Sequence, residues 1–473
     1  MLPLSPRYWR EVPALPERME QFLDTAMDQV RWKRAKAPLR RELETHLLDQ
    51  QDACLEQGMA PEEAQAEAVR QMGDPVVVGQ ELDRVHRPQP QWGLLGLTLL
   101  LALTGGILRV GLTAAMPDAI QVSQTVLALL LGCGCLLGAY FLDYTFLGRY
   151  ARIVYWGAVV LGGLSLIFSP NYNNASYYTR YVVLLYPVAY AALVYALRGK
   201  GWKGLALAIL GGVPLAVIAM LAPYLLGLVI LLVTGALLLL CAVCRDWFGV
   251  GKHAGTLALV LLLLLCGALC LYCGLSQGYF QKRLTLLLHP EADALGAGYM
   301  ATAIQSALAG AQWLGEGTIG GFFGDSTTPY WMLVPESGRD ALLTTLIHRL
   351  GWMPFLALML TVAGTLAWVL VKCLRQKNEL GRLISLAVVL TLGLQAVSSL
   401  LLNLGYPFTS GTFPLLVGNL HSILDMGLLG LALSVFRQEK MPLPAISSPL
   451  PGPLRRPVVT WRDGELVIAL RRN

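Results

Sequence analysis

The chain has 473 residues, of which 55% are apolar and only 14% are charged, whereas a soluble domain carries about 25% charged residues. This composition excludes an ordinary soluble globular protein and predicts an all-α membrane protein, because the apolar residues are gathered in long runs. The formal net charge of +6 is not arranged as a basic stripe interleaved with aromatic residues, so no nucleic-acid partner is expected.

Residues 1–88 are polar and are predicted to form a small cytoplasmic helical domain. One amphipathic helix begins near Pro16, and a second continues through 39–48, where apolar residues recur at helical spacing. Gly58 ends the second helix. Pro61 then starts a third helix, which has acidic residues in its first turn.

A fourth, short helix over about 75–85 completes this domain, which resembles the permease prefix domain found ahead of some bacterial membrane proteins. The resemblance implies a docking or regulatory role, and a passive helical cap is the alternative. The matching segments are Glu42-Leu43-x-x-His46-Leu47-x-Asp49, Gly58-Met59-x-Pro61-Glu62-Glu63-Ala64 and Met72-Gly73-Asp74-Pro75.

Residues 92–436 contain apolar runs of about 20 residues, and each run can cross the roughly 30 Å hydrocarbon layer as a helix. We expect about ten spans, with a large loop, 277–340, between the seventh and the eighth. The spans are predicted at 92–113, 121–142, 151–169, 181–197, 203–220, 224–244, 254–275, 341–371, 383–403 and 412–436.

Lysine and arginine are unevenly distributed among the loops that join these spans. Short cytoplasmic loops carry an excess of both residue types. The distribution predicts that the N- and C-termini are cytoplasmic and that loop 277–340 is extracytoplasmic. The residues assigned to the cytoplasmic side are Arg149, Arg152, Arg198, Lys200, Lys203, Arg245, Lys252, Lys372, Arg375, Lys377 and Arg382.

Two ionisable residues, His421 and Asp425, lie four residues apart on one face of the last predicted span. A structural His–Asp pair is the favoured interpretation, and a contact with lipid headgroups is the alternative. After this span, residues 437–473 form a predicted cytoplasmic tail, in which 458–468 are typical of a β-hairpin with an Asp-Gly turn.

Loop 277–340 concentrates carboxylates, arginines, tryptophans and glycines, the residue types from which a reaction site is built. It closes with Val334-Pro335-Glu336-Ser337-Gly338-Arg339-Asp340. Ahead of this run stand Gln281-Lys282-Arg283-Leu284-Thr285, Leu288-His289-Pro290-Glu291-Ala292-Asp293, Gly296-Ala297-Gly298-Tyr299, Gln305-Ser306-Ala307-Leu308-Ala309-Gly310 and Trp313-Leu314-Gly315-Glu316-Gly317, and Leu350-Gly351 follows it.

With the spans and the large loop, this order of motifs resembles the FtsW/RodA/SpoVE (SEDS) family over roughly 92–436. The resemblance implies a peptidoglycan glycosyltransferase of the bacterial cytoplasmic membrane. Such an enzyme polymerises lipid II, the undecaprenyl-pyrophosphate-linked disaccharide pentapeptide, at the outer face, in cell division, cell shape or sporulation. The resemblance also implies membrane lipids and a single-span penicillin-binding transpeptidase as partners, and it identifies Asp340 with the essential aspartate of the family.

The residue types in the loop agree with such a reaction. Glycosyl transfer needs a base for the acceptor hydroxyl and positive charge for the leaving pyrophosphate. Asp340 is the candidate base or the ligand of a divalent cation, Mg²⁺ or Mn²⁺, and partial burial at a membrane interface is expected to raise its pKa. The candidate substrate-binding residues are Lys282, Arg283, Arg339, Glu336 and Trp313.

Each of these residues also has a structural interpretation. Asp340 could cap the next helix, because aspartate is favoured at helix N-termini. Arg283 could mark the membrane edge, Glu336 could be a solvated charge, and Trp313 could belong to the interfacial aromatic belt.

Several segments depart from the family pattern. His348-Arg349 stand where relatives usually carry paired glutamates, and Val417-Gly418-Asn419-Leu420-His421-Ser422 stand where they have Ser-Tyr-Gly-Gly-Ser. Two alternatives to the polymerase therefore stay open. One is a flippase for the lipid-linked precursor, and the other is a catalytically weakened scaffold of the cell-wall machinery.

Overall fold

A computed structural model describes residues 16–113, 122–172, 175–222, 224–276, 281, 285–286, 288–324, 327–406, 411–414, 420–439, 457–462 and 465–470. The chain divides into two compact units, one of residues 1–90 with 438–473 and one of residues 91–437. Each unit is described separately below.

The N-terminal helical domain consists of four helices, which begin and end close to the predicted positions. Gly58 and Gly73 have φ angles of 86° and 85°, a left-handed conformation that glycine adopts without strain, and they end the second and third helices. The buried side chains of Met19, Leu23 and Leu39 form the centre of its core. The helices are α1 (Glu17–Gln29), α2 (Lys33–Glu56), α3 (Pro61–Met72) and α4 (Pro75–His86).

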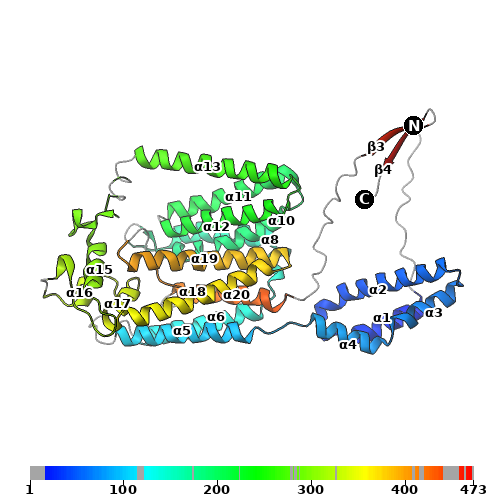
Figure 1. The fold of residues 1–473 in the computed structure, drawn as a ribbon, viewed down its shortest axis with the longest axis horizontal. Helices are drawn as coiled ribbons and strands as arrows, with labels where there is room; N and C mark the ends of the chain where they lie inside the picture. The colour runs from blue at the N-terminus through cyan, green and yellow to red at the C-terminus, as the bar shows by residue number, and fades with distance from the viewer. Residues whose placement is uncertain are drawn as a thin grey trace. The chain divides into compact units, whose positions relative to one another are not determined.

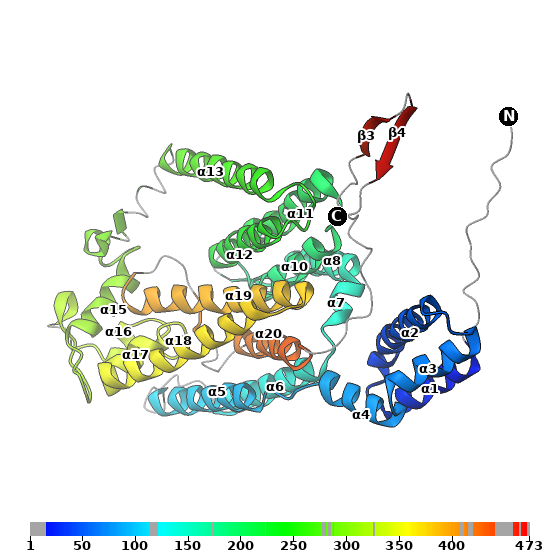
Figure 2. The same cartoon turned by 45° about the vertical axis from the view of Figure 1, so that its right-hand side comes forward.

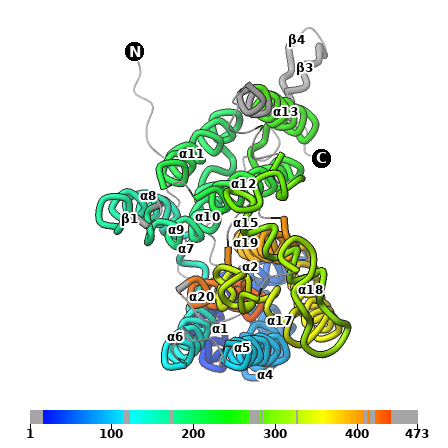
Figure 3. The backbone as a smooth tube through the Cα atoms, turned by 90° about the vertical axis from the view of Figure 1, so that its left-hand side faces the viewer, coloured from blue at the N-terminus to red at the C-terminus, as the bar shows by residue number. Residues whose placement is uncertain are grey.

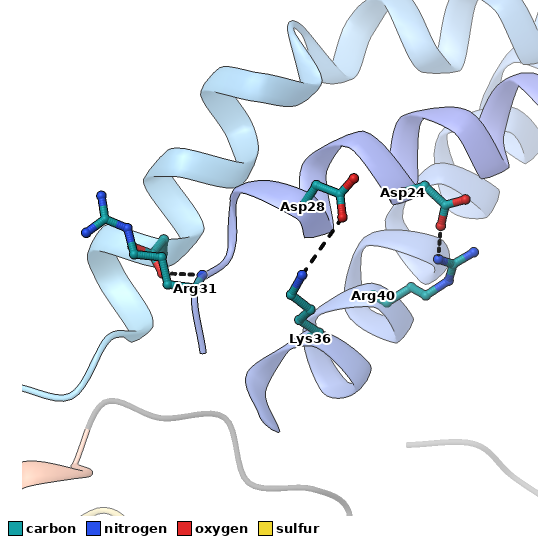
Figure 4. Close-up of polar contacts among 6 residues, drawn as sticks. Asp24, Asp28, Arg31, Lys36 and Arg40 are labelled. Carbon is teal, nitrogen blue, oxygen red and sulfur yellow. Dashed lines mark hydrogen bonds and ion pairs between the residues drawn. The ribbon is translucent and has the colours of Figure 1, made fainter. Parts of the chain in front are cut away.

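Ion pairs on the surface of this domain join its helices (Figure 4). Lys36 pairs with Asp28 at 3.9 Å, and Arg40 pairs with Asp24. The backbone N–H of Arg31 donates to the carboxylate of Asp83 at 2.9 Å, which attaches the segment after α1 to α4. Exposed ion pairs contribute little to stability, so the apolar core is the main stabilising element of this domain.

The C-terminal tail contains the predicted hairpin. Strands β3 (Pro457–Arg462) and β4 (Glu465–Leu470) pair antiparallel, with Arg462 opposite Glu465. This register leaves a two-residue connection, and the Asp463-Gly464 turn itself lies outside the described residues.

The second unit is a membrane domain whose described secondary structure is helical apart from one short β-ribbon, in agreement with the predicted all-α fold. Its helices up to the long loop are α5 (Trp92–Thr113), α6 (Val122–Phe141), α7 (Thr145–Arg149), α8 (Ala151–Phe168), α9 (Thr179–Val183), α10 (Tyr186–Ala196), α11 (Gly201–Leu221), α12 (Leu225–Cys244) and α13 (Lys252–Ser276), with a two-residue β-ribbon, β1 (Asn171–Tyr172) and β2 (Ala175–Ser176), before α9. The loop and the remaining spans form η1 (Pro290–Asp293), α15 (Tyr299–Ala309), η2 (Gly321–Phe323), α16 (Tyr330–Leu333), α17 (Leu342–Leu350), α18 (Trp352–Arg375), α19 (Glu379–Asn403) and α20 (Leu420–Arg437).

Within the described residues, eight helical stretches are long and apolar enough to cross a membrane, with α9 and α10 counted as one stretch. Helices α13 and α20 lie at the seventh and tenth predicted spans but are not among the eight, so these criteria do not confirm the expected number of ten.

The predicted eighth span, 341–371, is wrong as a single helix. The structure divides it into α17 and α18 at Gly351, whose φ of 97° breaks the helical path. A side chain at this position would also collide with the backbone of Trp313, because an added Cβ would lie 2.6 Å from the Trp313 carbonyl oxygen. The close approach of these two segments explains why the chain turns here although its sequence stays apolar.

The membrane helices form a bundle in which α10 and α19 are the most enclosed. Helices α15, α16 and α17 gather at one end of this bundle (Figure 1, Figure 2). Figure 3 looks onto that end, where the loop helices lie over the ends of α5, α18 and α19. We call this group of loop helices the loop cluster. It holds the turn that carries Asp340 against the bundle.

Candidate active site

The turn between α16 and α17 places Asp340 directly before a helix. The backbone N–H groups of Arg339 and Ala341 both donate to the carbonyl oxygen of Glu336, at 2.8 and 3.1 Å. Glu336 has a φ of 55°, the left-handed conformation that costs a non-glycine residue about 1–3 kcal/mol. The surrounding contacts therefore impose this turn.

Asp340 does not cap α17. The N-cap residue is Ala341, and the backbone N–H of Thr344 is taken by the side chain of Asn403 at 2.8 Å instead. The capping interpretation is therefore wrong, because a side chain from α19 fills the capping position. The carboxyl group of Asp340 remains available for another role.

The environment of Asp340 is that of a base that titrates near neutral pH. The residue is half-buried, and burial raises the pKa of its carboxyl group to about 6. The negative charge of Glu336 contributes to this rise, and the positive charges of Arg180 and Arg339 oppose it. A carboxylate with such a pKa is ionised at pH 7 and still has appreciable affinity for a proton.

Arg180 is a site residue that the sequence reasoning missed. It lies in α9, about 160 residues before Asp340 in the chain. Its guanidinium lies over the rings of Tyr177 and Tyr181, 4.4 and 4.9 Å from their centroids, and donates to the hydroxyl of Tyr181 at 2.9 Å. The only signal in the sequence was a positive charge in a loop that the distribution of lysine and arginine predicts to face outward, where few such charges occur.

Two further arginines contribute positive charge to the same region. Arg339 forms an ion pair with Glu336 at 3.6 Å, and both side chains are more than half exposed. Arg109, near the end of α5, is buried, and its charge interacts with that of Arg339. The sequence reasoning named Arg339 but not Arg109, because an arginine four residues from the end of an apolar run resembles a membrane-edge residue.

His421 and Asp425, two buried polar residues of α20, contact side chains of other helices. The ring of His421 packs edge-on against Tyr181, with centroids 4.6 Å apart, and Asp425 accepts a hydrogen bond from Gln395 at 3.1 Å. The predicted His421–Asp425 pair is therefore wrong, since each side chain has a partner on a different helix. Spacing of four residues places two side chains on one face but does not choose their partners.

Trp313, the remaining predicted site residue within the described part of the chain, does not lie at this turn. Trp313 is 69% exposed, and its backbone contacts Met353 at the start of α18, beyond the far end of α17. A nine-residue helix is about 13 Å long, which separates Trp313 from Asp340. Lys282 and Arg283 lie outside the described residues.

The carboxylates of Asp340 and Glu336 are the candidate ligands of a divalent cation. No cluster of three or more His, Cys, Asp or Glu side chains that could hold a metal ion occurs in the part of the chain that the structure describes. Two carboxylates still fit Mg²⁺, which commonly binds one or two protein carboxylates together with phosphate oxygens of a substrate. The donor set therefore suits a cation that arrives with a diphosphate.

The sequence is similar to curated FtsW proteins, although no protein-family model matches the chain. It is 29% identical over 177 residues to the probable peptidoglycan glycosyltransferase FtsW of Thioalkalivibrio sp. (strain K90mix), covering 36% of this chain and 42% of that protein. It is 32% identical over 166 residues to the protein of the same name from Alteromonas naphthalenivorans, covering 35% of this chain and 28% of that protein. The matches thus span less than half the length of these relatives.

The fold is similar to that of a chain from a solved structure described as "Structural coordination of polymerization and crosslinking by a peptidoglycan synthase complex". The TM-score is 0.58 at 23% identity, covering 74% of this chain and 98% of that chain. This likeness identifies the fold of the membrane domain, and the curated relatives agree with it. This multi-pass membrane chain is therefore similar in sequence to curated FtsW proteins over about a third of its length, and its membrane domain is similar in fold to a chain of a peptidoglycan synthase complex.

Proposed function

We propose that the protein is a peptidoglycan glycosyltransferase that polymerises lipid II at the outer face of the cytoplasmic membrane. One observation carries this proposal: a half-buried carboxyl group, Asp340, lies within range of the charges of Arg180 and Arg339 at one end of the membrane bundle. A base within electrostatic range of two guanidinium groups is a combination suited to glycosyl transfer from a diphosphate donor.

In the proposed reaction, the carboxylate of Asp340 accepts the proton of the acceptor sugar hydroxyl. The hydroxyl oxygen forms a bond to the anomeric carbon of the donor, and the bond from that carbon to the diphosphate oxygen breaks. The diphosphate leaves with the bonding electron pair and its lipid. Arg180 and Arg339 stabilise the negative charge that develops on it, since guanidinium groups bind phosphate oxygens through paired hydrogen bonds.

A divalent cation, Mg²⁺ or Mn²⁺, would bind the oxygens of Asp340 and Glu336 and would neutralise diphosphate charge. In that case Glu336 needs to leave its ion pair with Arg339, which frees the guanidinium for the substrate. Because both side chains are exposed, this exchange requires little rearrangement.

The depth of the polar groups favours chemistry at the surface over a flippase. Arg109, Gln395 and Asp425 each lie within about eight residues of the helix end that faces the loop cluster, or about 12 Å along a helix. A path for a charged headgroup needs polar groups at mid-depth as well. The catalytically weakened scaffold stays an alternative. Measuring polymerisation by wild type and by Asp340 variants distinguishes it from the polymerase.

We further propose that both termini are cytoplasmic and that a transpeptidase with one membrane helix is the partner. Small residues at a lipid-facing position permit close helix packing. Gly162 is not available, because an added Cβ would lie 1.9 Å from the Tyr186 hydroxyl, whereas Gly163 on α8 has open space around it. The face of α8 around Gly163 is therefore the preferred surface for such a helix.

Polymerisation by purified protein supplied with lipid II and Mg²⁺ or Mn²⁺ tests the function. Asp340→Asn keeps the size of the side chain but removes the base, so glycan formation should fall by at least about a hundredfold. The control is Glu291→Gln, an exposed carboxylate of the same loop that pairs with His289. Equal polymerisation by Asp340→Asn and wild type would refute the role of this residue. A wild-type protein without polymerase activity, under conditions where a relative is active, would favour the scaffold.

A further inference from the structure

Asn403, the last residue of α19, contacts both the backbone of Asp340 and the start of α17. Its side chain is completely buried. The amide nitrogen donates to the carbonyl oxygen of Asp340 at 2.8 Å and to that of Ser399 at 2.8 Å. The amide oxygen accepts the backbone N–H of Thr344 at 2.8 Å and the hydroxyl of Thr344 at 3.0 Å.

These contacts provide a helix cap from a distant part of the chain. The first N–H groups of a helix have no partner within it, and an N-cap side chain normally accepts one of them at the second or third position. In α17 the N-cap residue is Ala341, which has no acceptor, and Thr344 is at the third position. Asn403 therefore supplies the hydrogen-bond acceptor that an N-cap side chain normally provides.

The chemistry of the contacts requires an amide. One end of the Asn403 side chain faces two carbonyl oxygens, and the other end faces an N–H and a hydroxyl. Aspartate has the same shape but would direct an acceptor toward the carbonyl oxygens. Alanine would leave a buried N–H and buried carbonyl oxygens without partners, which is unfavourable.

The end of α19 that carries Asn403 is itself fixed. The side chain of Gln305, in α15, donates to the carbonyl oxygen of Gly405 at 3.2 Å, and Gly405 has a φ of 88°. The backbone at Asp340 is thus attached through Asn403 to a helix of the bundle that is braced in turn by the loop cluster.

We propose that Asn403 is a positioning residue for Asp340, which holds the backbone so that the carboxyl group stays half-buried within range of Arg180. This inference rests on the proposed function for its catalytic consequence but not for the geometry. A change at Asn403 should loosen the backbone from Asp340 to Thr344, whether or not the protein polymerises lipid II.

The test compares Asn403→Ala with Asn378→Ala. Asn378 is the N-cap of the same helix at its opposite end, where its side chain accepts the N–H of Leu380 at 3.0 Å. Each variant loses an amide that caps a helix, but only Asn403 contacts Asp340. Hydrogen–deuterium exchange of the peptide that contains Asp340 and Thr344, followed by mass spectrometry, measures this attachment without any assay of activity.

We expect slow exchange of this peptide in wild type and in Asn378→Ala, and exchange about tenfold faster in Asn403→Ala, because the buried N–H of Thr344 loses its acceptor. Where polymerisation is measurable, kcat of Asn403→Ala should fall by about a hundredfold with little change in KM, because the base is misplaced. If Asn403→Ala does not fold, Asn403→Ser, which introduces no charge, is measured in its place.

Unchanged exchange of this peptide in Asn403→Ala, together with losses of activity that follow thermal stability equally at Asn403 and Asn378, would overturn the proposal. If exchange is faster in Asn403→Ala but the wild-type protein makes no polymer, the positioning role stands and the result counts against the glycosyltransferase.

Discussion

The imidazole ring of His348 stacks on the phenol ring of Tyr330, with centroids 4.2 Å apart and planes 9° apart. The hydroxyl of Tyr330 is 3.0 Å from that of Thr345, which donates to the carbonyl oxygen of Ser337 at 2.7 Å. The stack thus joins α16 to α17 on either side of the turn that carries Asp340. In this chain His348 has a structural role at a position where the sequence departs from the family pattern.

His348→Ala should therefore loosen the loop cluster. Loss of the stacked ring removes about 0.5–1.5 kcal/mol beyond the buried area, so the melting temperature of the purified protein should fall. His348→Phe keeps a flat ring and should retain most of the stability. Equal melting temperatures for His348→Ala and wild type would show that the stack does not stabilise the fold.

Cysteine labelling tests the orientation. A cysteine at Thr327, an exposed residue of the long loop, should react in intact cells with a thiol reagent that does not cross membranes. A cysteine at Lys377, exposed between α18 and α19, should react only after the cells are opened. Both variants are made without the native cysteines. The reverse labelling pattern would invert the proposed topology and place Asp340 on the cytoplasmic side.

The pH dependence of polymerisation should follow the titration of Asp340. Its pKa is raised to about 6, and a base acts only when it is deprotonated. The rate should therefore be half-maximal near pH 6 and should decrease at lower pH. Glu336→Gln removes a nearby negative charge that raises this pKa, so the midpoint should move to lower pH. A rate that is constant from pH 5 to pH 8 would contradict a carboxylate base.

Stability should show the opposite trend. Because the folded-state pKa of Asp340 lies above the ordinary value of about 4, the folded protein binds the proton more tightly than the unfolded chain does. The contribution of this group to stability is fully present below pH 4 and is lost as the pH rises toward 6. Asp340→Asn should melt at a temperature that changes less with pH across this window.

Local signals in the sequence predicted the parts of the fold that depend on neighbouring residues. Gly58, Pro61 and Gly73 delimit the helices of the N-terminal domain because their effects on the backbone act within one turn. Long apolar runs located most membrane helices for the same reason. The break at Gly351 was not predictable, since it depends on the approach of Trp313, about forty residues earlier in the chain.

The site was predicted in part. Asp340, Glu336 and Arg339 lie within one short segment, and the structure places them in one turn. Arg180 and Asn403 come from α9 and α19, and no spacing rule connects them to Asp340. Their contribution depends on packing between helices that are far apart in the sequence, and the amino-acid sequence of a single protein does not reveal this packing.

Arg180 provides the sharpest test of the charges around Asp340. Arg180→Ala removes a positive charge that lowers the pKa of Asp340, so this pKa should rise and the half-maximal rate should move above pH 6. The loss of a diphosphate partner should also reduce kcat/KM by about ten- to a hundredfold.

Arg180→Lys separates charge from geometry at this site. Lysine retains the positive charge and should keep the pH midpoint near 6, but it lacks the planar guanidinium that lies over Tyr177 and Tyr181. Its kcat/KM should therefore fall almost as far as that of Arg180→Ala while its pH profile resembles that of wild type. Rates and midpoints are measured with lipid II at several concentrations, with the exposed Arg152→Ala as control. If both Arg180 variants keep the rate and the midpoint of wild type, Arg180 neither binds the diphosphate nor influences the pKa of Asp340.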